Sequence, residues 1–402
     1  MTSRRLGVSP AEGPPQNGSP DSSREPSLDL GLAEDARIQR LRVRVGVIGC
    51  GYWGPHLIRN LHDMPEVELV GVAEERQERL RYVRRAYPTV RPFSDHRQLL
   101  ECDLDAVVIA TPIQTHYQLV KEALVVGKHV LVEKPLAHTP AGAAELVALA
   151  GRRQRVLMVG HTFLYNPAVR ELRRLVHEGE LGRIYYADAA RLNLGLFQRY
   201  ANVIWDLAPH DIAILMYLLG KPPVMVSARG SSYVRSGVHD VCYLELLFSD
   251  ETTAHVHVSW LDPDKVRRLT LVGDRRMAIY DDVSADAKLR VYDSGVEYPT
   301  ADNYGEFELA YRHGQIVIPH ISWREPLRVE CEHFVHCVRS GERPLSDGEH
   351  GLAVVTALEA ADRSLRNGGV RVPLEIPPAD RQAGNGVAAH PEAAVAQPGH
   401  AH

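Results

Sequence analysis

The sequence predicts two folded domains: a doubly wound α/β domain with a parallel sheet, then an α+β domain with a large, mostly antiparallel sheet. Strands alternate with helices over residues 41–159, whereas strand-like runs follow one another without crossover helices over most of 160–376. The 402 residues, 45% of them hydrophobic, suffice for two packed cores. Residues 1–40 and 377–402 show little apolar periodicity, which predicts disordered ends.

The first domain reads as six strands with intervening helices. The run 105–110 is almost wholly apolar, as expected for a parallel strand buried on both faces. A charged, aromatic connection passes through Phe93. We expect, in order, strand 43–48, helix 54–64, strand 67–73, helix 75–87, helix 95–101, strand 105–110, helix 115–126, strand 128–132, helix 139–151 and strand 156–159.

The second domain reads as long strands rich in aromatic and β-branched residues. One helix interrupts them, and two amphipathic helices close the fold. We expect helix 166–178, strands 184–194, 224–234, 239–248, 252–260, 266–273 and 276–280, an interrupting helix at 210–219, and helices 326–340 and 348–367.

Composition and charge exclude several classes of protein. The net charge of −5 gives no general attraction to nucleic acids or anionic membranes. No apolar run approaches the ~18 residues of a membrane span, and residues 1–29 hold no apolar core of the signal-peptide type. Five scattered cysteines without a Cys-x-x-Cys pair indicate reduced thiols and a soluble, cytoplasmic protein.

One stretch organises the first domain, because strand 43–48 runs directly into a glycine-rich turn. In a dinucleotide site Gly49 permits the tight turn, Gly51 lets the backbone approach a pyrophosphate, and Gly54 lets helix and strand pack closely. The pyrophosphate would lie on free amides at the start of the following helix. The full motif, Gly49-Cys50-Gly51-Tyr52-Trp53-Gly54, predicts a Rossmann dinucleotide-binding domain; an ordinary strand-to-helix turn is the alternative.

The end of strand 67–73 bears on the choice of cofactor. Glu74 follows the strand where an acidic residue accepts hydrogen bonds from the adenosine ribose hydroxyls. The charges of Glu74 and Glu75 would repel a 2′-phosphate, so NAD is the expected cofactor. Arg76 and Arg79 leave room for NADP.

Two further strand ends point toward the same ligand, because ligands of open α/β sheets bind beyond the carboxyl ends of the strands. Thr111 and Pro112 end one strand and could line the ribose and nicotinamide, with His116 shortly after; a surface or capping histidine is an equal alternative. Glu133 and Lys134 end the next strand. Lys134 is either a solvated lysine at a strand end or a lysine that contacts a reacting hydroxyl.

In the second domain, Asp206 and His210 are four residues apart, close to one helical face. An Asp–His pair suits general acid–base chemistry, because imidazole titrates near neutrality and a carboxylate orients it. Pro209 is best tolerated in a first helical turn, so Asp206 is equally a candidate helix cap.

Other polar groups give weaker signals. His255 and His257 alternate on one strand face but lack a third zinc ligand nearby. His333 and His336 lie with Cys331 and Cys337 on a predicted helix, and one buried helix face explains this spacing. We therefore expect no metal site. Four further polar residues either belong to an ordinary polar loop or bind a phosphorylated or hydroxyl-rich ligand. They are Arg191, Asn193, Arg199 and Asn202.

Together these motifs resemble the Gfo/Idh/MocA oxidoreductase family over roughly residues 42–370. The resemblance implies that Lys134 and His210 form the catalytic pair, with Asp206 as a supporting carboxylate and the Lys-Pro motif beneath the nicotinamide. The second sheet would carry substrate contacts and a subunit interface, which implies a homo-oligomer (dimer or tetramer). The matching residues are Gly49–Gly54, Ala110-Thr111-Pro112 with His116, Glu133-Lys134-Pro135, and Asp206 with His210.

Three further stretches resemble a branch that oxidises a ring hydroxyl of nucleotide sugars, including carbon 3 of UDP-N-acetylglucosamine-type substrates. By that resemblance Tyr165, Asn166, Arg191, Asn202 and Trp260 are expected to contact substrate. The stretches are Gly160-His161-Thr162-Phe163-Leu164-Tyr165-Asn166-Pro167, Asn202-Val203-Ile204-Trp205-Asp206 and Ser259-Trp260-Leu261-Asp262-Pro263.

The expected reaction is a reversible hydride transfer between a sugar hydroxyl carbon and nicotinamide. His210 would take the hydroxyl proton, Lys134 would stabilise alkoxide charge, and Asp206 would orient the imidazole. The alternatives are an inositol or free-sugar dehydrogenase, an NAD-dependent glycoside hydrolase on the same scaffold, and a non-catalytic cofactor-binding sensor.

Overall fold

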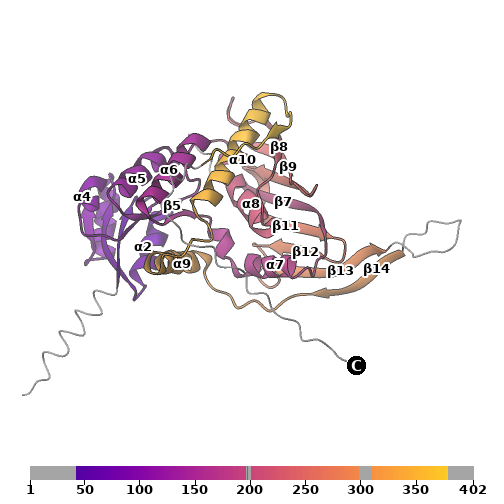
Figure 1. Cartoon of the computed structure of the whole chain (residues 1–402), viewed down its shortest axis with the longest axis horizontal. Helices are drawn as coiled ribbons and strands as arrows, with labels where there is room; N and C mark the ends of the chain where they lie inside the picture. The colour runs from indigo at the N-terminus through magenta and orange to yellow at the C-terminus, as the bar shows by residue number, and fades with distance from the viewer. Residues whose placement is uncertain (1–41, 196, 198–200, 298–309, 379–402) are drawn as a thin grey trace, which may run out of the picture. The chain divides into compact units, whose positions relative to one another are not determined.

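A six-stranded sheet and a nine-stranded sheet form the folded part of the protein in this computed structural model (Figure 1). The structure describes residues 42–195, 197, 201–297 and 310–378. Contacts divide the chain into the units Met1–Arg42 and Val43–His402. The end predicted at 1–40, and all but two residues of the one predicted at 377–402, lie outside the described residues, and the domain boundary at 159/160 stays a prediction.

The first sheet is parallel, in the order β3-β2-β1-β4-β5-β6 expected of a doubly wound fold. The sequence-based fold class is confirmed. The third strand lies in the connection through Phe93, for which the sequence analysis gave no bounds. The strands are β1 Val43–Ile48, β2 Val67–Ala73, β3 Arg91–Phe93, β4 Ala106–Ile109, β5 His129–Glu133 and β6 Leu157–Gly160.

Helices connect these parallel strands, and their starts follow local sequence signals. Asp95 caps α4 by accepting from the Arg97 amide, and Thr139 caps α6 by accepting from the Gly142 amide. Pro140 stands at the start of α6, where its missing N–H removes no helical bond. The helices are α2 Gly54–His62, α3 Gln77–Ala86, α4 His96–Leu100, α5 Ile113–Val125 and α6 Pro140–Arg153.

The second sheet has the order β14-β13-β12-β11-β7-β10-β9-β8-β15. Its pairs are antiparallel except β7 with β10, which agrees with the predicted mostly antiparallel sheet. The last three strands, β13 to β15, were not predicted from the sequence. The strands are β7 Ile184–Leu194, β8 Met225–Ser231, β9 Val241–Leu247, β10 Thr253–Ser259, β11 Leu261–Gly273, β12 Met277–Asp281, β13 Leu289–Glu297, β14 Ala310–Val317 and β15 Val372–Pro373.

Helices of the second half pack on one side of this sheet and against the end of β6 (Figure 1). Contacts join α10 to α6, α8 and β8, and α9 to α2 and the 3₁₀ turn that follows β6. The elements are the 3₁₀ turn η1 Thr162–Tyr165, α7 Pro167–His177, α8 Val203–Leu219, α9 Pro326–Ser340 and α10 Gly348–Arg366.

Helix α8 begins at Val203 and not at residue 210, so Pro209 lies inside the helix. The cap is Asn202, whose side chain accepts from the Trp205 amide, and the reading of Asp206 as a cap is wrong. Val203, Ile204 and Trp205 are buried. Packing of this first turn holds a helix that proline alone would disfavour.

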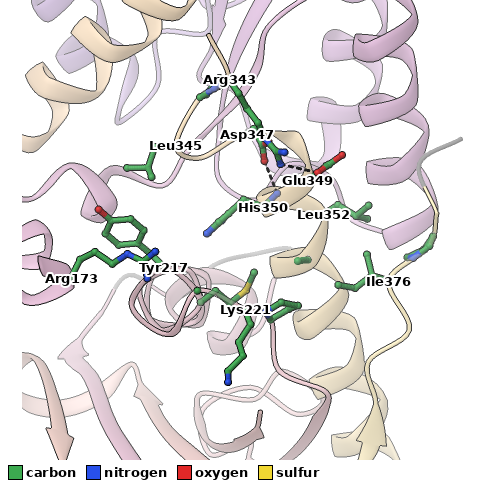
Figure 2. Close-up of a pocket in the computed structure, with 16 residues that line it drawn as sticks. Arg173, Tyr217, Lys221, Arg343, Leu345, Asp347, Glu349, His350, Leu352 and Ile376 are labelled. Carbon is green, nitrogen blue, oxygen red and sulfur yellow. Dashed lines mark hydrogen bonds and ion pairs between the residues drawn. The ribbon is translucent and has the colours of Figure 1, made fainter. Parts of the chain in front are cut away.

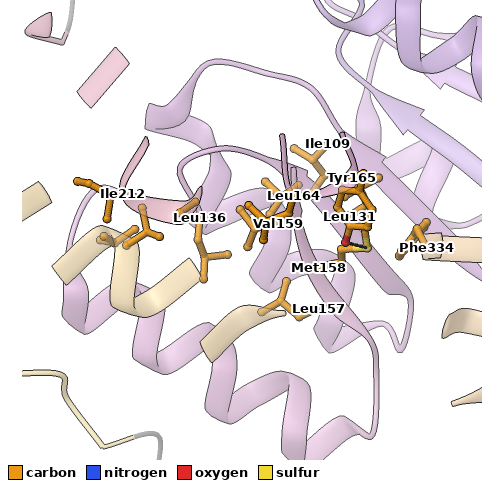
Figure 3. Packing of buried hydrophobic residues seen from close by; sticks show 14 of the residues in the cluster. Ile109, Leu131, Leu136, Leu157, Met158, Val159, Leu164, Tyr165, Ile212 and Phe334 are labelled. Carbon is orange, nitrogen blue, oxygen red and sulfur yellow. Dashed lines mark hydrogen bonds between the residues drawn. The ribbon is translucent and has the colours of Figure 1, made fainter. Parts of the chain in front are cut away.

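Apolar side chains of both sheets meet in one continuous core. Figure 3 shows Leu136 and Val159 at the end of the first sheet, with Ile212 of α8 in the same core. The hydrogen bond from Lys134, which follows β5, to the Asp206 carbonyl sets α8 against the carboxyl end of β5, where ligands of this sheet architecture bind. Among the described residues, no helix is both long enough and apolar enough to cross a bilayer.

Candidate functional site

The glycine-rich turn after β1 has the backbone that a dinucleotide cradle requires. Gly49 adopts φ +100°, and a Cβ there would lie 2.6 Å from the Ala110 carbonyl oxygen. A Cβ at Gly54 would lie 2.5 Å from the Gly49 carbonyl oxygen, so both positions require glycine. Trp53 precedes α2 without a capping side chain, so no side chain occupies the helix start, where an anion would meet the Gly54 amide; Pro55 has no amide N–H, and the His56 amide donates to the Trp53 carbonyl at 3.0 Å.

A cavity of about 1000 Å³ adjoins this turn. Gly49 and Gly51 lie on one side, Glu74 and Arg76 on another, and the end of β4 on a third. Thr111 and Pro112 contribute that last wall, and the Thr115 hydroxyl donates to Thr111 Oγ1 at 2.8 Å. Tyr52 and Trp53 flank the turn with 74% and 47% of their surface exposed. The glycines, open helix start and cavity fit a dinucleotide.

Glu74 is anchored to the glycine turn as well as facing the cavity. Its Oε2 accepts from the Cys50 amide at 2.8 Å, and its Oε1 accepts from the Arg76 amide and Nε, each at 3.1 Å. Burial acts to raise the pKa of Glu74, but the Arg76 and Cys50 hydrogen bonds outweigh it, and the pKa is lowered. The cavity therefore carries a fixed negative charge at neutral pH, opposed to a 2′-phosphate.

His116 joins two strand-end loops from a fully buried position. Its Nδ1 contacts the Pro135 carbonyl and its Nε2 contacts the Thr111 carbonyl, both at 2.8 Å. Burial lowers the pKa of His116, although both carbonyls favour the protonated ring. The surface reading of His116 is wrong, since only 1% of it is exposed. His116 thus holds Thr111 and Pro135 in place, and its contact with a cofactor stays a prediction.

The structure brings Lys134, Asp206 and His210 to the region where β5 meets α8. Lys134 Nζ donates to the Asp206 carbonyl oxygen at 2.6 Å and lies 3.7 Å from Asp206 Oδ1. Pro209 lies inside α8 and lacks the amide that would bond the Trp205 carbonyl. Lys134 reaches this turn of α8, and the solvated reading of this lysine is wrong, because only 13% of its side chain is exposed.

His210 lies next to this pair in a positively charged setting. Its ring meets the Phe163 ring edge-on with centroids 5.0 Å apart. Burial holds the pKa of His210 well below its ordinary value, and the charges of Lys134 and Arg191 act in the same direction. Its Nδ1 is buried without a hydrogen-bond partner among the described residues. His210 is therefore a neutral imidazole at pH 7, able to accept a proton.

Glu133, named from the sequence, lies close enough to Glu330 of α9 for their charges to interact, and this partner was not expected. Burial raises the pKa of Glu133 to about 7, although the Lys134 charge opposes it. Glu330 of α9 accepts from the Thr162 hydroxyl at 2.8 Å; burial, and then the Glu133 charge, raise its pKa well above the ordinary value. The available signal was a glutamate on the apolar face of α9, between Leu327 and Phe334.

The five residues expected to bind substrate all make internal contacts. The Tyr165 hydroxyl is hydrogen-bonded to Ser346 Oγ at 2.9 Å, and Asn166 caps α7. Arg191 donates twice to Asp211 at 2.7 and 2.9 Å, and both side chains are buried. Asn202 caps α8, and the Trp260 indole donates to Asp206 Oδ2 at 3.0 Å. Their contact with substrate stays a prediction; Arg199 lies outside the described residues.

The candidate metal ligands are not gathered into a cluster. Among the described residues, no group of three or more His, Cys, Asp or Glu side chains could hold a metal ion. His333 instead accepts from the Leu345 amide at 3.0 Å, and Tyr243 and His257 stack face to face with centroids 4.3 Å apart. The five cysteines are free thiols.

Comparison of the sequence with models of known protein families tests the family membership that these motifs imply. The oxidoreductase family with an NAD-binding Rossmann fold, Gfo/Idh/MocA, matches residues 43–161, and the C-terminal domain of the same family matches residues 169–279. The chain belongs to the Gfo/Idh/MocA oxidoreductase family. Its cofactor is NAD, and the cradle of Gly49, Gly51 and Glu74 is the part of this chain that fits it.

Individual relatives match this chain over almost their own whole length. A putative oxidoreductase structure from Magnetospirillum magnetotacticum is 30% identical, with a TM-score of 0.69, covering 80% of this chain and 99% of its own. A UDP-N-acetylglucosamine 3-dehydrogenase structure from Acidithiobacillus ferrooxidans is 27% identical, with a TM-score of 0.67, covering 81% and 98%. A myo-inositol 2-dehydrogenase from Thermotoga maritima is 25% identical over 80% of this chain and 96% of its own length.

Proposed function

We propose that this oxidoreductase transfers a hydride between a ring hydroxyl carbon of a sugar and the nicotinamide of NAD. The observation that carries the proposal is the meeting of Lys134, Asp206 and His210 at the carboxyl end of β5, the strand next to β4, whose end lines the dinucleotide cavity. A protein that only binds a cofactor needs no lysine, carboxylate and neutral histidine at that place. The arrangement disfavours the reading as a cofactor-binding sensor.

The chain's own groups divide the reaction between them. His210, neutral at pH 7, takes the hydroxyl proton as the carbonyl forms. Lys134 places a positive charge where alkoxide charge develops, held by the Asp206 carbonyl at 2.6 Å. Asp206 is itself held by Lys134 and the Trp260 indole, so it sets the lysine's position. Bound NAD supplies the hydride acceptor.

For the substrate, we favour a nucleotide sugar of the UDP-N-acetylhexosamine type, oxidised at a ring carbon. Support comes from the relative that is a UDP-N-acetylglucosamine 3-dehydrogenase. Inositol and free sugars are the second candidate substrates, because another relative is a myo-inositol 2-dehydrogenase. An NAD-dependent glycoside hydrolase is the third alternative. Net release of an aglycone without accumulation of NADH would identify the hydrolase.

We also propose that the protein is a cytoplasmic homo-oligomer that associates through the uncovered face of the nine-stranded sheet. The face carries Tyr186, Tyr243, His255 and Glu245, of which Tyr186 and Tyr243 are 43% and 57% exposed. Two large aromatic side chains on one open sheet face are typical of a protein contact. Light scattering of the purified chain would test this, and a monomer at micromolar concentration would contradict it.

A substrate panel tests the proposed reaction. The protein is incubated with NAD or NADP and UDP-, dTDP- and GDP-sugars, inositols or free sugars, and reduced cofactor is followed by absorbance. We expect NADH to form with a UDP-N-acetylhexosamine and not with inositol. Turnover of inositol alone would overturn the substrate class, and turnover of no hydroxyl compound would overturn the reaction.

A further inference from the structure

Arg267, on β11, lies one aromatic ring away from the histidine proposed as the base. The Phe163 ring meets the His210 ring edge-on with centroids 5.0 Å apart, and the Arg267 guanidinium lies over the same Phe163 ring, with Cζ 5.7 Å from its centroid. Arg191 lies over this ring too, with Cζ 4.5 Å from the centroid. One half-buried phenyl ring therefore contacts the proposed base and two positive charges.

The register of the second sheet brings the two arginines together. Arg267 of β11 stands directly opposite Arg191 of β7 in an antiparallel pair, so both side chains lie on the same face of the sheet. Like charges directly opposite one another destabilise a sheet unless each has a partner of its own. The two arginines differ in how far such partners occupy them.

Arg191 is fully paired within the fold. Its Nε and Nη2 donate to the two oxygens of Asp211 at 2.7 and 2.9 Å, and only 4% of Arg191 is exposed. Figure 2 shows a second case in a separate cavity, where Arg343 Nε donates to Asp347 and Arg343 Nη2 donates to Glu349. In both arginines the Nε–Nη2 edge, which fits an oxyanion, is occupied by carboxylate oxygens.

Arg267 has this same edge open. Among the described residues its hydrogen bond runs from Nη1 to Asp282 Oδ2 at 3.2 Å, and its Nε and Nη2 have no partner there. Of the Arg267 side chain, 36% is exposed, so the open edge is reached from solvent. A guanidinium held in this way binds a phosphate or a carboxylate with two parallel hydrogen bonds, as Arg191 binds Asp211.

Asp282, which holds Arg267, is itself fixed by buried groups. Its Oδ1 accepts from the Tyr280 hydroxyl at 3.0 Å and from Asn166 Nδ2 at 3.2 Å, and both of these residues are buried. The Lys288 ammonium donates to the Asp282 carbonyl at 2.7 Å and adds a positive charge nearby. The Arg267 guanidinium is therefore positioned before a ligand arrives, which lowers the entropic cost of binding.

We propose that the open edge of Arg267 binds an oxyanion carried by the substrate, a phosphate or carboxylate attached to the sugar whose hydroxyl reacts at His210. The inference rests on the proposed hydride transfer. Because Phe163 contacts both residues, a substrate with its hydroxyl at His210 has to extend by little more than one sugar ring to place an anion on Arg267. The diphosphate of a nucleotide sugar and the carboxylate of a uronic acid meet this requirement, whereas inositol and neutral free sugars carry no such group.

Calorimetric titration of the NAD complex tests this site without turnover. The probes are UDP-N-acetylglucosamine, glucuronate and neutral N-acetylglucosamine, and the proteins are wild type, Arg267→Gln and Arg267→Lys. Loss of a charged, two-bond contact is expected to weaken binding of an anionic probe ~10–100-fold in Arg267→Gln, with binding of N-acetylglucosamine changed by less than about twofold. Arg267→Lys keeps the charge without the planar edge, so we expect a smaller loss.

Arg268→Gln is the matched control, since Arg268 is the next residue of β11 and its exposed side chain lies on the opposite face of the sheet. A loss confined to UDP-N-acetylglucosamine identifies the anion as a phosphate, and a loss with glucuronate identifies it as a carboxylate. Equal binding of both anionic probes by Arg267→Gln and Arg268→Gln would overturn the proposal. Wild-type protein that binds neither anionic probe more tightly than N-acetylglucosamine would overturn it as well.

Steady-state kinetics with a sugar that reduces NAD separates the anion site from the proposed function. A contact made equally in the ground and transition states acts on KM, so we expect KM of Arg267→Gln to rise about tenfold or more while kcat falls less than about threefold. A fall in kcat at unchanged KM would mean that Arg267 acts on His210 through Phe163, and would overturn anion binding. If no sugar reduces NAD but Arg267→Gln still loses an anionic probe, the proposed function fails and the anion site stands.

Discussion

The indole nitrogen of Trp260 donates to Asp206 Oδ2 at 3.0 Å, and this bond links the second sheet to the turn of α8 that Lys134 contacts. Trp260 follows β10 and is 1% exposed, so its position is fixed by packing. Asp206 in turn holds Lys134 by its carbonyl and its carboxylate. The register of the second sheet therefore controls where the lysine ammonium lies above β5.

Replacement of Trp260 by Phe tests this link, because the indole donor is lost while most of the ring volume stays. A hydrogen bond to a charged group contributes about 1.5–3 kcal/mol, so we expect kcat to fall ~10–100-fold with NAD affinity unchanged. Trp323→Phe is the control, since Trp323 is 51% exposed and lies over Lys288. Equal kcat values for the two variants would show that Trp260 does not position Asp206.

Glu74 is expected to set the choice between NAD and NADP. In Glu74→Ser the negative charge facing the 2′ position is lost and Arg76 is released from its carboxylate partner. We expect NAD to bind about tenfold more weakly and NADP more tightly than in the wild type. Quenching of tryptophan fluorescence reports both affinities, since the exposed Trp53 flanks the cradle, with the exposed Glu78→Ser as control. An unchanged ratio of the two dissociation constants would assign cofactor choice elsewhere.

Glu330 predicts a pH dependence of stability. Its pKa is raised in the folded state, so the folded protein binds more protons than the unfolded one above pH 4.5, and stability is lost as pH rises through the folded pKa. Glu330→Gln removes this loss and keeps an acceptor for Thr162. We expect the variant to melt several degrees higher than wild type at pH 8 and equally at pH 4.5.

The exposed Glu342→Gln is the matched control for this pH dependence. Thermal unfolding of all three proteins at both pH values is the measurement. If Glu330→Gln were less stable than wild type at pH 8, the carboxylate would be a stabilising anion, contrary to its buried setting.

The first sheet could be predicted closely from the sequence, whereas parts of the second could not. Strands such as β1 and β4 are buried runs whose type is fixed locally. The strands β13 and β14 carry Arg290, Asp293 and Arg312 with a glycine in each, so their pattern resembles a polar loop. Their pairing becomes evident only in the folded sheet.

The candidate site shows the same division between local and distant causes. Lys134, Asp206 and His210 could be singled out because they stand in local motifs that resemble the Gfo/Idh/MocA family; spacing alone left other readings of each open. The burial of Tyr165 could not, because its hydroxyl partner Ser346 lies 181 residues away in sequence. Because of Pro209, the predicted start of α8 was too late, for a similar reason: the packing that stabilises the first turn involves residues remote from it.

His210 is expected to act as the base. In His210→Asn the ring is lost while a polar side chain of similar reach remains. Loss of a general base lowers rates by ~10²–10⁴-fold, so we expect such a fall in kcat with little change in the dissociation constant of NAD. The wild-type rate should stay level as pH falls through 6.5, because burial holds the pKa of His210 well below that value. A His210→Asn enzyme within threefold of wild type would exclude this role.

The most direct test of the proposed reaction follows the hydride itself. UDP-N-acetylglucosamine with deuterium on carbon 3 is incubated with the protein and NAD, and the cofactor is recovered and analysed by NMR. Hydride transfer from carbon 3 predicts deuterium at C4 of the nicotinamide, on one face only, and none with His210→Asn over the same time. Reduced cofactor without deuterium, or product formed without any reduced cofactor, would contradict it.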